Sequence, residues 1–98
     1  MGVKFETFVL DLLPALGLTP LAHRYKILKD GVEVGEVDVL AQDSAKRLYA
    51  VEIKAGKVDV SGVRQAYINA KLLNATPMVI CRGYALSLIH ISEPTRPY

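Results

Sequence analysis

Three strand-like segments follow one another between two helix-like segments, and this order restricts the folds open to the chain. The strand-like segments are residues 22–28, 34–41 and 47–54, separated by polar turns at 29–31 and 42–46. The first turn contains Asp-Gly, which between two strand patterns favours a hairpin. The sequence therefore predicts an antiparallel meander of three strands.

The helix-like segment before the meander has apolar residues at helical spacing from position 5 to position 16. Gly17 is a natural end for this helix. Pro14 cannot donate a backbone hydrogen bond to Leu10, so a kink or an early end is expected.

The segment after the meander predicts a second helix, capped by Ser61 and running to about residue 74. Thr76-Pro77 breaks this helix. The continuous apolar run at 78–81 is typical of a buried parallel strand. A strand–helix–strand unit crosses over in the right-handed sense, which places this strand parallel to the third strand of the meander.

The element order is therefore αβββαβ, and the fold class is α/β, with a mixed four-stranded sheet flanked by helices. The chain has 98 residues, of which 51% are hydrophobic and 22% charged, a composition typical of one small globular domain. A single cysteine excludes a disulfide framework within the chain and a cysteine-based zinc site.

The last thirteen residues are expected to lie outside the native domain. Residues 86–96 read as the codon-by-codon translation of a widely used transposase sequencing adapter. Such segments are set aside before the fold is considered. We therefore expect a truncated domain at 1–85 and a tail of adapter origin at 86–98.

Charge and hydropathy favour a cytoplasmic protein without a membrane span. No apolar run reaches the ~18 residues that a span requires. The start of the chain, Met-Gly-Val-Lys-Phe-Glu, argues against a secretory signal. The net charge of +2 neither predicts nor excludes a nucleic-acid partner.

Charged residues interrupt two of the strand patterns. Side chains alternate along a strand, so Glu52 and Lys54 share a face. In an antiparallel pair, any register that keeps Val37, Val39, Val51 and Ile53 on the core face also places Asp38 opposite or diagonal to Glu52, roughly 5–8 Å away. Glu36 shares that face too.

Like charges that face each other across strands destabilise a hairpin, and a divalent cation reverses the sign of this interaction. Magnesium prefers oxygen ligands and needs only one or two carboxylates. Lys54 could orient an attacking water or neutralise charge on phosphate oxygens. The alternatives are a solvated acid at position 38 and a weak surface ion pair between Glu52 and Lys54.

These segments resemble the PD-(D/E)xK nuclease superfamily, most closely its RecB-like, archaeal Holliday-junction-resolvase-like and Mrr-like members. The matching residues are Gly-Glu-Val-Asp-Val-Leu-Ala at 35–41 and Tyr-Ala-Val-Glu-Ile-Lys-Ala-Gly at 49–56. The αβββαβ order is the superfamily's restriction-endonuclease-like core. Val37 stands where proline is frequent, and Asn69 stands where RecB-like members carry a tyrosine.

The resemblance implies hydrolysis of DNA phosphodiester bonds by a Mg²⁺-dependent enzyme, with Mn²⁺ as an alternative metal. Asp38, Glu52 and the carbonyl of Ile53 would bind the metal, and Lys54 would position or activate the water. Glu6 in the first helix fits a further acid of the family.

Gln65 fits the glutamine of RecB-like members and would steady Lys54 or a phosphate. Both Glu6 and Gln65 also have a plain structural alternative, as a helix-dipole acid and a solvated helix residue.

Lys57 and Arg64 follow the third strand and are candidates for contacts with DNA phosphates. The expected setting is repair, recombination or defence, and many relatives dimerise, so a homodimer of the full-length protein is a further expectation. The alternative function is a nuclease-like module that binds DNA or a protein without cutting.

Overall fold

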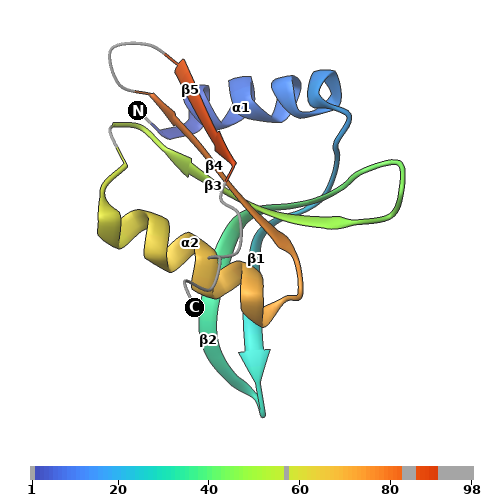
Figure 1. Ribbon diagram of the computed structural model, residues 1–98, viewed down its shortest axis with the longest axis vertical. Coiled ribbons are helices and arrows are strands. Elements are labelled where there is room, and N and C mark those ends of the chain that lie inside the picture. Colours follow the sequence, from blue (N-terminus) through green and yellow to red (C-terminus); the bar gives the residue numbers. More distant parts are fainter. Residues whose placement is uncertain (1, 57, 83–85, 91–98) are drawn as a thin grey trace, which may run out of the picture.

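The structure is a computed structural model that describes residues 2–56, 58–82 and 86–90, with side chains for 7–56 and 58–81. Figure 1 shows the elements in place. They are α1 (Gly2–Leu12), the 3₁₀ helix η1 (Leu13–Leu16), β1 (Thr19–Lys29), β2 (Val32–Gln42), β3 (Leu48–Lys54), α2 (Val60–Leu72), β4 (Thr76–Arg82) and β5 (Leu86–His90).

All the strands join one mixed sheet in the order β1-β2-β3-β4-β5. The meander β1–β2–β3 is antiparallel, and β4 pairs parallel to β3 after the α2 connection. This confirms the predicted α/β class and the αβββαβ core. The sheet has one strand more than predicted, because β5 pairs antiparallel with the outer edge of β4. That strand lies within the segment expected to be a tail.

The first helix ends early, as its proline predicts. The α-helix stops at Leu12 and continues as the 3₁₀ turn that contains Pro14. Gly17 then adopts the left-handed conformation (φ 81°), and its N–H donates to the carbonyls of Leu13 and Pro14. This is a glycine C-cap, which turns the chain sharply into β1.

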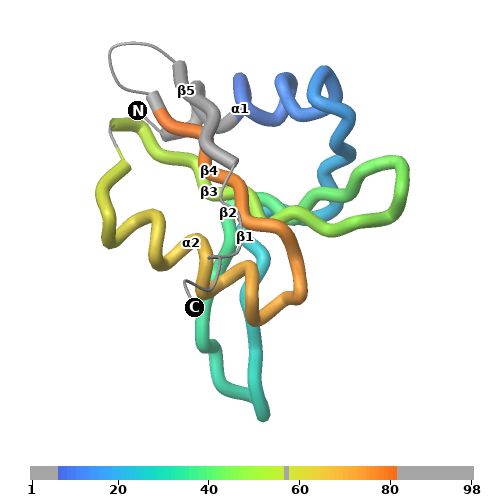
Figure 2. Tube along the Cα trace, in the orientation of Figure 1, coloured from blue at the N-terminus to red at the C-terminus, as the bar shows by residue number. Residues whose placement is uncertain are grey.

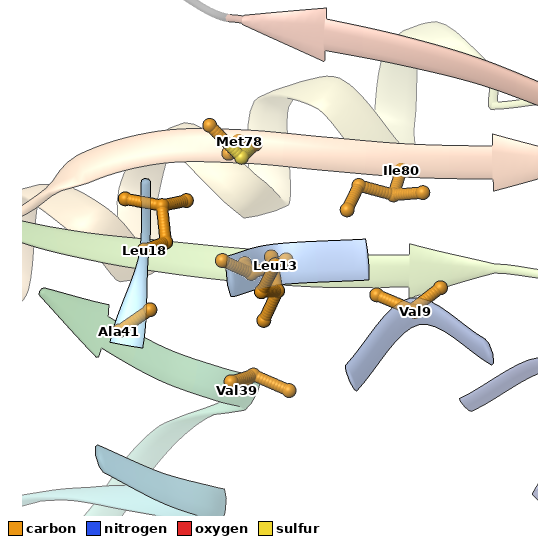
Figure 3. Packing of buried hydrophobic residues seen from close by; sticks show 8 residues of the cluster. Val9, Leu13, Leu18, Val39, Ala41, Met78 and Ile80 are labelled. Atoms are coloured by element: carbon orange, nitrogen blue, oxygen red, sulfur yellow. The ribbon is translucent and has the colours of Figure 1, made fainter. Parts of the chain in front are cut away.

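The face of the sheet under α1 carries the larger core. Figure 3 shows Val9, Leu13 and Leu18 against side chains of β2 and β4. Val9 and Leu13 are fully buried because their helical spacing turns both toward the sheet. Val39, Ala41, Val51, Met78 and Ile80 complete this cluster.

The opposite face is covered by α2, which approaches closely through small residues. Ala66 and Ala70 are buried against the sheet. The helix begins after Asp59, whose carboxylate accepts a hydrogen bond of 2.7 Å from the N–H of Gly62. The prediction of Ser61 as the cap is therefore wrong, because the helix starts a residue before it.

The expected core face of β2 is also partly wrong. Val39 and Val51 pack under α1, whereas Val37 packs with Ala50 and Ala70 under α2. At this point of the meander Arg24 in β1 has a left-handed backbone (φ 48°), between the pairs His23↔Val39 and Tyr25↔Val37. The register continues through this point without an extra residue, so the strand pair bends here and the alternation of faces is broken between Val37 and Val39.

Beyond this bend the β1–β2 hairpin projects away from the helices (Figure 2). Its tip carries exposed apolar side chains such as Leu28 and Val32. Within the part of the chain that the structure describes, no helix is both long and apolar enough to cross a membrane.

Candidate active site

The candidate site lies where β2 and β3 part. Their antiparallel pairing runs from Gln42↔Leu48 to Val39↔Val51 and goes no further. Asp38, the next residue of β2, sends its carboxylate into the opening, and its Oδ2 accepts a hydrogen bond of 2.7 Å from the N–H of Ile53. The carboxylate of Asp38 therefore accepts the hydrogen bond that a backbone carbonyl of β2 would accept if the two strands stayed paired.

The backbone of Ile53 faces the same opening. In a strand, the N–H and the carbonyl of one residue point to the same neighbouring strand. Since the N–H of Ile53 points to Asp38, its carbonyl also lies on the β2 side rather than the β4 side. This is the placement that the expected role of the Ile53 carbonyl requires.

Glu52 has a strongly perturbed carboxyl group. Burial, and after it the neighbouring charge of Asp38, raise the pKa of its carboxyl from 4.5 to about 7. The amide of Asn69 and the charge of Lys54 oppose this rise. The carboxyl groups of Asp38 and Glu52 lie within hydrogen-bonding reach of each other. The site thus holds two acids close together in a setting that disfavours their shared negative charge.

One oxygen of this pair has no protein partner. Oε2 of Glu52 is buried, and no described residue hydrogen-bonds it. A buried carboxylate oxygen normally has a donor or a cation beside it. The orphaned oxygen is the feature of the site that fits a cation.

A pocket between β3 and α2 brings three of the predicted residues together. Glu52, Lys54 and Gln65 line it, together with Gly62 and Ala66 of the helix. Lys54 is exposed at its mouth. The pocket therefore combines an acid, an ammonium group and an amide over one opening.

Asp38 lines a different pocket, on the α1 side, with Leu10, His23, Arg24 and Ile53. The single shared face expected for Asp38, Glu52 and Lys54 is therefore not what the structure shows. The bend near Arg24 changes the alternation of β2, so Asp38 and Glu52 approach the gap between their strands from two pockets.

Asn69 is a site residue that the sequence reasoning missed. It is 3% exposed, and it is the only buried polar residue among those described. Its Oδ1 accepts from Gln65 Nε2 at 3.2 Å, and its Nδ2 donates to the carbonyl of Glu36 at 3.1 Å. Position 69 lies one helical turn after Gln65 and on the same helix face as the buried Ala66 and Ala70. A polar residue on that buried face could have indicated a site residue from the sequence.

Of the remaining predicted residues, two fall outside the described side chains and two do not join the pair. The side chain of Glu6 and all of Lys57 lie outside the described residues. Arg64 is exposed on α2. Glu36 was predicted to share a face with Asp38 and Glu52. It instead forms an ion pair of 3.4 Å with Lys26 of β1.

The donor set fits a hard divalent cation with few protein ligands. Among the described residues, no group of three or more His, Cys, Asp or Glu side chains converges on a metal position. Two carboxylates and a backbone carbonyl remain, and magnesium commonly accepts that number while water and substrate complete its shell.

No family model and no curated protein matches the chain. Solved structures with a similar fold include a resolvase and a protein–DNA complex. One is Hjc, a Holliday junction resolvase of the archaeal hyperthermophile Archaeoglobus fulgidus, with TM-score 0.60 and 19% identity over 91% of this chain and 76% of that one. The other is an EndoMS–dsDNA complex, with TM-score 0.54 and 23% identity over 76% of this chain and 30% of that one. At these identities the likeness establishes the fold, which is restriction-endonuclease-like.

Proposed function

We propose that this protein is a divalent-metal-dependent nuclease of the PD-(D/E)xK type that hydrolyses DNA phosphodiester bonds. The observation that carries the proposal is the meeting of the Asp38 and Glu52 carboxyl groups, with Glu52 Oε2 left without a protein partner. The likeness in fold to a Holliday junction resolvase and to a protein bound to dsDNA supports the choice of substrate.

Asp38, Glu52 and the carbonyl of Ile53 would hold Mg²⁺ or Mn²⁺. When bound, the cation would supply positive charge to the phosphoryl group under attack. The two acids themselves need this charge, because each raises the cost of ionising the other.

Lys54 follows Glu52 by two residues in β3, is exposed, and lines the same pocket. There it would orient the attacking water or neutralise charge that builds on phosphate oxygens. Gln65 lies across the pocket and would steady Lys54 or a phosphate. Glu6 would add an acid from α1, and Lys57 and Arg64 would contact the DNA backbone.

This activity would serve repair, recombination or defence in the cytoplasm, with a homodimer as the full-length form. Residues 1–85 would form the nuclease-like domain, and 86–98 the adapter-derived tail.

The test is cleavage of plasmid and branched DNA with and without Mg²⁺. Lys54→Ala should lower the cleavage rate by about 100-fold or more, the usual effect of losing a group that assists proton transfer or charge stabilisation. Lys29→Ala, which removes an exposed lysine near the hairpin tip, is the matched control and should cleave like the wild type.

Equal cleavage by the Lys54→Ala and wild-type proteins would remove Lys54 from the reaction. Tight, metal-independent DNA binding without any cleavage would instead favour the alternative, a nuclease-like binding module.

A further inference from the structure

We infer that Asn69 is a positioning residue that orients Glu52 for cation binding and ties Gln65 to it. This inference rests on the proposed function and adds to the site a residue that contacts neither DNA nor metal.

The hydrogen-bonding capacity of Asn69 is used at both ends. An asparagine amide has an acceptor oxygen and two N–H donors. The oxygen accepts from Gln65 of α2, and the amino group donates to the Glu36 carbonyl of β2. The Asn69 side chain also lies beside the carboxyl of Glu52 in β3, where its amide lowers the pKa of that carboxyl. One buried amide thus connects the three elements that surround the site.

Asn69 lies beside the Glu52 carboxyl and favours its ionised form. Oε2 of that carboxyl is buried and has no hydrogen-bond partner among the described residues. A fixed amide beside the carboxyl restricts its rotation, and Oε2 is the oxygen left for a cation. Groups that fix a ligand in this way commonly raise metal affinity.

The position of the Asn69 side chain requires that residue 35 have no Cβ. A Cβ on Gly35 would lie 2.5 Å from Asn69 Oδ1 and 3.3 Å from its Cγ. Asn69 is buried and holds bonds to Gln65 and Glu36, so a shift away from this Cβ would strain both bonds. Gly35→Ala therefore disturbs Asn69 without touching an acid, the lysine or the glutamine.

The experiment measures two midpoints in a Mg²⁺ titration of the full chain: that of the rise in Tm and that of DNA cleavage. Asn69→Leu keeps the approximate size of the side chain and removes its polar atoms. It should require about 10–100-fold more Mg²⁺ at both midpoints. Cleavage at saturating Mg²⁺ should recover toward the wild-type rate, because Lys54 and both acids remain.

Ala70→Gly is the matched control, since it weakens the same helix next to Asn69 and its side chain packs in the apolar cluster of Ile27, Val37 and Ala50. It should lower Tm without moving either midpoint. Gly35→Ala should move both midpoints in the same direction as Asn69→Leu, and it decides the matter if Asn69→Leu does not fold.

If Asn69→Leu has the same two midpoints as the wild type, the role of Asn69 is overturned and the proposed nuclease remains intact. If Asn69→Leu does not fold, the same result in Gly35→Ala has the same meaning. A wild-type protein that neither gains Tm from Mg²⁺ nor cleaves DNA would overturn the proposed function, and this inference with it.

Discussion

At the scale of single residues, Glu52 sets the electrostatic character of the site. Its carboxyl is largely withdrawn from water, beside a second acid, in a strand whose other face is core. Lys54 and Asn69 offset only part of this cost, so the pKa of Glu52 stays near 7. Without a divalent cation, the site is therefore destabilised by its own ionisation.

This predicts a pH-dependent stability for the metal-free protein. The pKa of Glu52 in the folded state, about 7, exceeds its ordinary value of 4.5, so folding favours the protonated form. The stabilisation is complete below pH ~4.5 and is lost as the pH rises through ~7. With allowance for solvent screening, the loss in free energy of unfolding is on the order of 2 kcal/mol.

Denaturant unfolding at pH 5 and pH 8, in the presence of a chelator, measures this difference. Glu52→Gln should reduce the pH dependence. Glu33→Gln, which removes a half-exposed acid ion-paired to Lys26, should leave it unchanged. A pH dependence equal to that of the wild type in Glu52→Gln would show that the carboxyl ionises freely in the folded protein.

The acids could be chosen from sequence because charged residues are rare in strongly β-forming stretches. The parity argument that placed both acids on one face failed, because the alternation of β2 is broken between Val37 and Val39.

Asn69 left only a weak signal, a polar residue beside the buried Ala66 and Ala70, and the open oxygen of Glu52 left none. They depend on the depth at which α2 packs and on Gly35 beneath it, which are tertiary contacts.

At the scale of elements, local signals predicted the fold well where they act alone. Pro14 and Gly17 end the first helix, and Asp30-Gly31 turns the first hairpin, where both residues have positive φ. Predictions failed where two signals competed or where strands bend. Asp59 and Ser61 are both good cap residues, and the left-handed Arg24 has no sequence signature that would reveal the changed face of Val37.

The cap of α2 gives a prediction at this scale. Asp59→Ala removes the acceptor for the Gly62 N–H and should lower the free energy of unfolding by about 1 kcal/mol. Ser61→Ala, two residues further on in the exposed first turn, should change it by less than about 0.5 kcal/mol. Chemical denaturation of the two variants compares them directly, and a larger loss in Ser61→Ala would place the cap where the sequence pattern suggested.

At the scale of the whole molecule, the sheet order separates the site from the last strand. The acids belong to β2 and β3, and β4 lies between them and β5. β5 adds an edge to β4 through the pairs from Met78↔His90 to Arg82↔Leu86. The site is therefore built by the core that the αβββαβ pattern predicts.

A chain cut after residue 85 tests this separation. Its Tm should fall, because β4 loses its partner, while the Mg²⁺ concentration at the midpoint of stabilisation should equal that of the full chain. A folded 1–85 chain that no longer responds to Mg²⁺ would show that the last residues take part in the site.

The central claim is that Asp38 and Glu52, from the two strands that part at the centre of the sheet, hold one divalent cation. Anomalous diffraction from crystals soaked in Mn²⁺ tests it most directly. The account predicts a peak between the carboxyl oxygens of Asp38 and Glu52, with Glu52 contributing Oε2, and no peak there in Asp38→Asn crystals. Wild-type crystals without a peak at that position, or with Mn²⁺ bound only elsewhere, would contradict it.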